Sequence, residues 1–385
     1  MYAVKEAVIF APRPRVLVAE DQDDVIAALR LLLKNNGYEV DFVKSPGEAL
    51  RAISTGVFDA VLLDLNYSRD TTSGAEGIEL LSRVQALDDT LAVVAMTAWA
   101  SIDLAVDAMH HGACDFVQKP WDNAQLLRVL EKQMQRSRDL RRRRMDAQLE
   151  QQEAADVQRA LLPGEIAAPE GLAIVASSQS AKTVGGDYYD VIRLDRSRTA
   201  ICIGDVVGKG IGAALLMSNL QAAVRTLASE IEAPGSFCDR VNKIVCANNV
   251  RGKFITFFYC VVDCEQKRMA YTNAGHNWPI LVHSDGTCER LHTDDVVLGA
   301  VPDGSWGQNE VELRSGDRLV LFTDGISECA GLDGLEYGED LLQTFVCENA
   351  RLSAGGLKDR ILESIGDHCN HAFSDDATLI VVAVE

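Results

Sequence analysis

The sequence predicts an α/β domain built on a doubly wound, five-stranded parallel sheet, then a helical linker, then an α+β domain. Three observations predict this order. Apolar, β-branched runs alternate with helix-like segments in residues 15–133, residues 126–161 contain no glycine or proline, and hairpin-like runs mixed with helices follow from about residue 172. A chain of 385 residues is long enough for two domains, each with its own core.

Composition excludes several classes of function. The formal net charge of −20 argues against nucleic-acid or anionic-membrane binding, because both need clustered positive charge. No apolar run approaches the roughly 20 residues that span a bilayer, and the N-terminus lacks the organisation of a signal peptide. Ten cysteines without a C-x-x-C pair indicate reduced thiols and no zinc site. We therefore expect a cytoplasmic protein.

The first domain, residues 15–133, carries polar side chains where its predicted strands end. The strands are "RVLVAED", "YEVDFV", "AVLLDL", "LAVVAMT" and "DFVQKP". In a parallel α/β sheet the carboxyl ends of the strands form the ligand crevice. Carboxylates gathered there repel one another unless a hard cation such as Mg²⁺ binds, and a lysine and a hydroxyl suit the oxygens of a phosphoryl group. Any one of these residues alone also fits a helix cap or turn; the set comprises Glu20, Asp21, Asp64, Thr97 and Lys119.

Residues 134–162 form the predicted linker. The segment is rich in Arg, Gln and Glu, and Leu140, Ala147, Ala154 and Leu161 recur every seven residues. This repeat favours a helix that pairs as a coiled coil, although its partner positions are mostly polar. The "RRRR" run is expected to be a solvated helix face.

In residues 163–385 four acids stand beside glycine or another acid at predicted strand ends. They occur in "VGGDYYD", "IGDVVGKGIG", "LFTDGISE" and "SDDATL" as Asp187, Asp205, Asp324 and Asp375. Each motif alone is typical of a turn. Together, four carboxylates could hold two Mg²⁺ or Mn²⁺ ions about 4 Å apart for attack on a phosphoester. The glycine-rich stretch has the wrong spacing for a P-loop, and its match to a dinucleotide fingerprint is isolated.

The residues of the first domain resemble the response-regulator receiver domain, from about Arg15 to Gln133. The resemblance implies that Asp64 accepts the phosphoryl group. It also implies a Mg²⁺ held by Glu20, Asp21, Asp64 and the Asn66 carbonyl, phosphoryl contacts from Thr97 and Lys119, and Phe116 as the aromatic switch. One departure is the longer polar loop "DLNYSRDTTSGAEG", without the proline that receivers commonly carry after the acceptor.

From about Asp156 to Glu385 the motifs resemble the phosphatase 2C superfamily in its bacterial sporulation protein E-like branch. The resemblance implies a β-sandwich flanked by helices, with a dinuclear Mn²⁺ or Mg²⁺ centre that hydrolyses phosphoserine or phosphothreonine. Asp205 would bridge the metals, Val206 would lend its carbonyl, and Asp187, Asp324 and Asp375 would complete the shell. Asp190 and Asp376 would support the ligands, and His276 is expected to be a packed turn residue rather than a general acid.

These features predict a two-component output enzyme. A sensor histidine kinase or phosphotransfer protein would phosphorylate Asp64, and the phosphatase would act on a phosphoprotein. The resemblance implies a STAS-domain anti-anti-sigma factor as substrate in a partner-switching pathway, and the linker predicts a homodimer. The alternative is an adaptor that sequesters a regulator without turnover.

Overall fold

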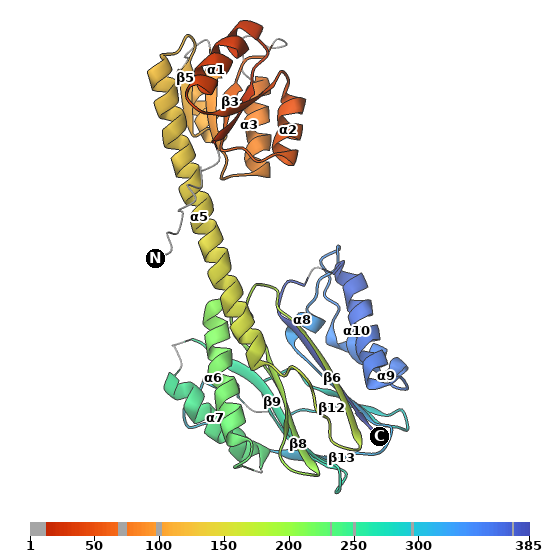
Figure 1. Ribbon diagram of the computed structural model, residues 1–385. Coiled ribbons are helices and arrows are strands. Elements are labelled where there is room, and N and C mark those ends of the chain that lie inside the picture. The colour runs from red at the N-terminus through yellow and green to blue at the C-terminus, as the bar shows by residue number, and fades with distance from the viewer. Residues whose placement is uncertain are drawn as a thin grey trace, which may run out of the picture. The chain divides into compact units, whose positions relative to one another are not determined.

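The computed structural model describes residues 13–67, 75–97, 102–231, 233–248, 252–293, 296–371 and 373–385. The chain divides into two units, Met1–Gln148 and Leu149–Glu385, and each unit is described by itself (Figure 1).

The first unit is built on one parallel sheet with the strand order β2-β1-β3-β4-β5. All four neighbouring pairs are parallel, and Val16 on β1 lies between Val40 on β2 and Ala60 on β3. The polar ends of β1, β3 and β4 therefore meet at one edge. The strands are β1 (Arg15–Ala19), β2 (Glu39–Val43), β3 (Ala60–Asp64), β4 (Ala92–Thr97) and β5 (Asp115–Gln118).

Helices cover both faces of this sheet, because its strands are buried on both sides and alternate residues enter two different cores. Leu17 and Ala19 pack with residues of α2, α3 and α4, whereas Val16 and Val18 pack with residues of α1 and α5. The helices are α1 (Asp23–Asn35), α2 (Pro46–Thr55), α3 (Ala75–Leu87), α4 (Ile102–His110) and α5 (Asn123–Leu161).

Helix α5 has 39 residues and changes its surroundings along its length. Leu126, Leu130 and Met134 are buried against the sheet of the first unit. Further along, Arg141 pairs with Asp88 at 2.8 Å, and Arg144 pairs with Asp89 at the same distance. Every residue from 145 to 153 is exposed. The middle of the helix thus lacks the burial that stabilises most protein helices.

The second unit contains two antiparallel sheets, ordered β13-β10-β9-β8-β7 and β12-β11-β14-β15-β6. The strands of the first are β7 (Tyr188–Arg193), β8 (Arg198–Val206), β9 (Ile255–Asp263), β10 (Arg268–Ala274) and β13 (Asn309–Glu312). Those of the second are β6 (Leu172–Gln179), β11 (Ile280–Val282), β12 (Cys288–Arg290), β14 (Arg318–Phe322) and β15 (Ala377–Val384).

The two sheets pack face to face, with helices on both outer faces (Figure 1). On β8, Ile201 and Ile203 point into the core between the sheets, while Ala200 and Cys202 point toward α6 and α7. On β15 the same alternation sends Ile380 inward and its neighbours toward α9 and α10. The helices are α6 (Ile211–Leu227), α7 (Pro234–Asn248), α8 (Asp324–Ser327), α9 (Glu339–Asn349) and α10 (Ala354–Cys369).

The predicted fold class is confirmed: a five-stranded parallel α/β sheet precedes a β-sandwich flanked by helices. No helix in the described parts of the chain combines the length and the apolar character needed to cross a bilayer.

Candidate functional site

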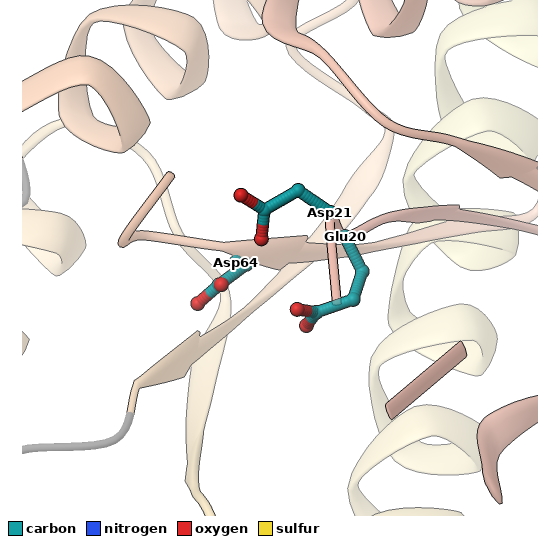
Figure 2. Close-up of side chains that lie close together, drawn as sticks. All are labelled: Glu20, Asp21 and Asp64. Carbon is teal, nitrogen blue, oxygen red and sulfur yellow. The ribbon is translucent and has the colours of Figure 1, made fainter. Parts of the chain in front are cut away.

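The first cluster of acids lies at the carboxyl edge of the parallel sheet. Glu20 and Asp21 directly follow β1, and Asp64 is the last residue of β3. One carboxylate oxygen from each lies within 4.8 Å of the others, and these three form the one such group among the described residues. Figure 2 shows the three carboxylates extending toward the same space. This oxygen-rich geometry suits a hard divalent cation.

Lys119 supplies the positive charge beside these acids. Its Nζ lies 2.5 Å from Glu20 Oε2 and 3.0 Å from Asp64 Oδ2. Burial raises the pKa of Glu20 to about 7, although the hydrogen bond from Lys119 acts in the opposite direction and lowers it. Burial also raises the pKa of Asp64, while the charge of Lys119 lowers it. The lysine thus partly offsets a concentration of negative charge that burial would otherwise disfavour.

The other predicted receiver residues surround this cluster at different depths. Thr97 is the last residue of β4 and is buried. Asn66 donates its backbone N–H to Asp64 Oδ1 at 3.3 Å. Phe116, on β5, is 40% exposed, so its ring is not packed in the core. Residues 68–74 of the long polar loop lie outside the described residues.

The second cluster begins with Asp187, which directly precedes β7. Its Oδ2 accepts hydrogen bonds from the Thr323 hydroxyl at 2.8 Å and the Thr378 hydroxyl at 2.6 Å. Among the described residues its buried Oδ1 has no hydrogen-bond partner, while the Asp205 side chain lies close enough for the two carboxyl groups to interact. Burial raises the pKa of Asp187 well above its ordinary value. A buried carboxylate oxygen without a partner is uncommon in a folded protein, and a bound cation would satisfy it.

Asp205 and Val206 end β8 beside the loop that carries Asp187. Burial raises the pKa of Asp205 to about 7, and the charge of Asp324 raises it further. A Cβ on Gly186 would lie 2.8 Å from the Val206 carbonyl oxygen and 3.2 Å from Asp205 Oδ1. Only glycine therefore lets this loop approach the end of β8 so closely.

Asp324 and Asp375 come from the second sheet. Asp324 begins α8, with one residue between it and the end of β14, and Asp375 lies just before β15. Burial and then the charge of Asp375 raise the pKa of Asp324. A Cβ on Gly325 would collide with the Asp376 backbone carbonyl, so glycine is needed after Asp324. The two sheets therefore bring all four predicted acids to one end of the sandwich, where they influence one another electrostatically.

These four acids are more widely spaced than the first cluster. Within the described part of the chain, no three of them bring their oxygens as close together as Glu20, Asp21 and Asp64 do.

The glycine-rich turn after β8 serves this cluster. Gly208 and Gly210 have φ values of +101° and +79°, which favour glycine. Between them, Lys209 places its Nζ 2.7 Å from Asp375 Oδ2 and donates to the Ser374 carbonyl at 2.8 Å. The turn thus places the positively charged side chain of Lys209 beside the acids.

Asp376 and Asp190 hold the framework of the second unit. Asp376 accepts backbone hydrogen bonds from Gly186 at 2.6 Å and Ala181 at 2.8 Å. Asp190 is fully buried and pairs with Arg225 at 2.7 Å. Both carboxylates are therefore engaged in supporting contacts.

His276 is buried in the second unit. Its Nδ1 lies 2.9 Å from the Thr256 hydroxyl, and burial lowers its pKa to about 4. A neutral, buried imidazole is poorly suited to deliver protons to a substrate at neutral pH.

Thr323, Thr378 and Lys209 are site residues that sequence reasoning missed. The signal was their position: Thr323 directly precedes Asp324, Thr378 closes "DDAT", and Lys209 lies within the glycine-rich turn.

Two families match this chain. Residues 16–131 match the response regulator receiver domain, and residues 195–385 match Stage II sporulation protein E (SpoIIE). Phosphoserine phosphatase RsbU of Bacillus subtilis (strain 168) is 35% identical over 231 residues, which are 60% of this chain and 68% of RsbU. The chain belongs to the SpoIIE phosphatase family. Its second unit is therefore a PP2C-type protein serine/threonine phosphatase, and the predicted pairing with a receiver domain is confirmed.

Two further proteins are similar to single parts of this chain. The transcriptional regulatory protein ZraR of Salmonella typhimurium (strain LT2) is 33% identical over 124 residues, which are 32% of this SpoIIE-family chain and 27% of ZraR. The SiaA-PP2C domain of Pseudomonas aeruginosa has a TM-score of 0.56 at 20% identity, covering 63% of this chain and 98% of that domain. The first likeness is confined to a minor part of ZraR, and the second shows the fold alone.

Proposed function

We propose that this chain is a response regulator whose output is metal-dependent hydrolysis of phosphoserine or phosphothreonine in a partner protein. The observation that carries the proposal is the gathering of acids around Asp187, whose buried Oδ1 has no hydrogen-bond partner among the described residues. Burial and the charges of neighbouring acids raise the pKa values of Asp187, Asp205 and Asp324. Such a cluster is electrostatically unfavourable unless cations bind it.

The donor set fits two Mg²⁺ or Mn²⁺ ions, because every ligand is an oxygen. Asp187, Asp205, Asp324 and Asp375 would hold the ions together with the Val206 carbonyl. When bound, the ions would supply a water activated for attack on phosphorus and would stabilise the developing charge.

The protein's own groups would orient this centre. Thr323 and Thr378 fix Asp187 so that only Oδ1 is available, and Asp376 holds the Gly186 backbone against the acids. Lys209 carries positive charge at the exposed rim, where it could meet the oxygens of an incoming phosphoryl group.

In the receiver unit, Asp64 would be the nucleophile toward the phosphoryl group of a sensor histidine kinase, a phosphotransfer protein or acetyl phosphate. Its oxygen forms the new bond to phosphorus while the donor group leaves. Lys119, 3.0 Å from Asp64 Oδ2, would pair with the phosphoryl oxygens, and Thr97 would contact them from β4. Mg²⁺ would be held by Glu20, Asp21, Asp64 and the Asn66 carbonyl. Phe116 would be the aromatic switch, whose ring changes position when Asp64 is phosphorylated.

The proposed substrate is a phosphorylated STAS-domain protein, an anti-anti-sigma factor in a partner-switching pathway. Two observations support it: the family resemblance, and the similarity to RsbU, a phosphoserine phosphatase. We also propose a homodimer formed through α5, supported by exposed apolar residues Leu140, Met145 and Leu149. One member of the heptad repeat, Ala154, packs within its own unit.

The test is turnover of a purified phospho-STAS protein by the full chain with Mn²⁺ or Mg²⁺, with and without acetyl phosphate. Multiple turnovers that depend on the added metal support the proposal. Stoichiometric binding without phosphate release would instead establish the adaptor alternative.

A further inference from the structure

The side chain of Gln158 joins the end of α5 to the loop that carries Asp187. Gln158 is 9% exposed. Its Nε2 donates to the Gly185 carbonyl at 2.7 Å, and its Oε1 accepts from the Gly185 N–H at 3.0 Å. An amide is the side-chain group that can satisfy a donor and an acceptor of one backbone residue in this way.

The opposite side of the same loop is held by Asp376. The Gly186 N–H donates to Asp376 Oδ2 at 2.6 Å, and a Cβ on Gly185 would collide with that oxygen and lie 2.9 Å from Ser180 Oγ. The two glycines are therefore fixed between Gln158 and Asp376. Asp187 follows immediately, so its Oδ1 depends on where this loop is held.

The other described contacts of this part of α5 include a hydrogen bond from Gln221 Nε2 on α6 to the Leu161 carbonyl at 3.3 Å, and apolar packing. Ala154 and Ala155 pack against Val184 and Ala214 in a small apolar cluster. Small side chains bury little area and constrain position weakly. Among the described residues, the hydrogen bonds that join α5 to this loop are the two made by Gln158.

We infer that Gln158 is a positioning residue that sets the affinity of the phosphatase centre for its metal by fixing the Gly185–Gly186–Asp187 loop. The inference rests on the proposed function. When α5 shifts, the hydrogen bonds of the Gln158 amide move the loop with the helix. A movement of α5 therefore changes the position of Asp187.

The test compares Gln158→Met and Gln158→Ala with Gln152→Ala in the full chain. Met keeps the buried volume but cannot form the hydrogen bonds to the Gly185 backbone. Gln152 is an exposed glutamine of the same helix that donates to Asp156, also on α5. Hydrogen exchange of the Gly185 and Gly186 amides in metal-free protein should speed up at least about tenfold in both Gln158 variants. It should stay unchanged in Gln152→Ala.

The second measurement is the Mn²⁺ concentration that gives half-maximal turnover. It should rise at least about tenfold in Gln158→Met, with kcat at saturating Mn²⁺ within about threefold of wild type. Wild-type exchange rates, or faster exchange with an unchanged Mn²⁺ requirement, would overturn the inference. If the wild-type chain has no phosphatase activity, the proposed function fails, and direct Mn²⁺ binding by calorimetry still decides the role of Gln158.

Discussion

Asp205 is the acid on which the proposed phosphatase centre depends most. Its pKa of about 7 shows how strongly burial and neighbouring acids act on it. Asp205→Asn and Asp324→Asn should each lower turnover of a phosphoserine protein at least about 100-fold, because a neutral amide is a poor metal ligand. Asp285→Asn, in an exposed turn of the same unit, is the control and should retain activity. Near-normal rates in either site variant would exclude a dinuclear centre held by these acids.

Asp64 should accept a phosphoryl group from acetyl phosphate in the presence of Mg²⁺. Asp64→Asn should not, because an amide is not a nucleophile for phosphorus. Asp24→Asn removes an exposed acid just outside the cluster and should be phosphorylated like the wild type. Intact-mass spectrometry measures the outcome, and equal mass gain in Asp64→Asn would show that another residue is the acceptor.

His276 should make the second unit sensitive to mild acid. Burial lowers its pKa from 6.5 to about 4, so between these values the unfolded chain binds a proton that the folded chain does not. Stability therefore falls as pH decreases through about 6.5 toward 4, by about 2 kcal/mol between pH 7.5 and 5. Urea unfolding at pH 7.5 and 5 should show a smaller loss in His276→Gln than in wild type. Equal losses would mean that other groups cause the acid sensitivity.

At the scale of elements, hydrophobic periodicity predicted the receiver strands to within a residue or two. "AVLLDL" became β3, Ala60–Asp64, because a strand buried on both faces is a short, continuous apolar run. The long helix starts earlier than the predicted residue 126. Asp122 accepts the Gln125 N–H at 2.8 Å and so caps a helix that begins at Asn123, a local signal that periodicity does not contain.

The candidate site was less predictable than the elements that carry it. The acids stood out because each lies beside glycine or another acid at a strand end. Their partners did not, because Thr323 is 136 residues from Asp187 and Thr378 is 191 residues away. Pairings of this kind arise only when antiparallel strands are ordered in a sheet, and strand order is not written in any local pattern.

At the scale of the whole molecule, coupling between the two units should depend on α5. Replacing residues 145–151 with a Gly-Ser segment should leave both units folded but abolish the response of phosphatase rate to Asp64 phosphorylation, because a flexible chain transmits no rotation. The replacement begins after Arg144, since Arg141 and Arg144 pair with Asp88 and Asp89 in the first unit. An Ala, Glu and Lys-rich helical replacement of equal length is the control. If the Gly-Ser chimera responds to phosphorylation like the wild type, the helix only connects the two units and does not transmit the signal.

The uninterrupted course of α5 has a consequence for linker length. Each residue added to an α-helix turns one end by about 100° relative to the other, whereas seven residues complete nearly two turns and leave an offset of about 20°. Inserting one or two residues within 145–153 should therefore disturb signalling more than inserting seven, although the longer insertion moves the helix ends further apart. What must be kept is then the rotation of one helix end relative to the other, rather than the length of the helix. Relatives with the same two units should therefore differ in linker length by multiples of seven residues.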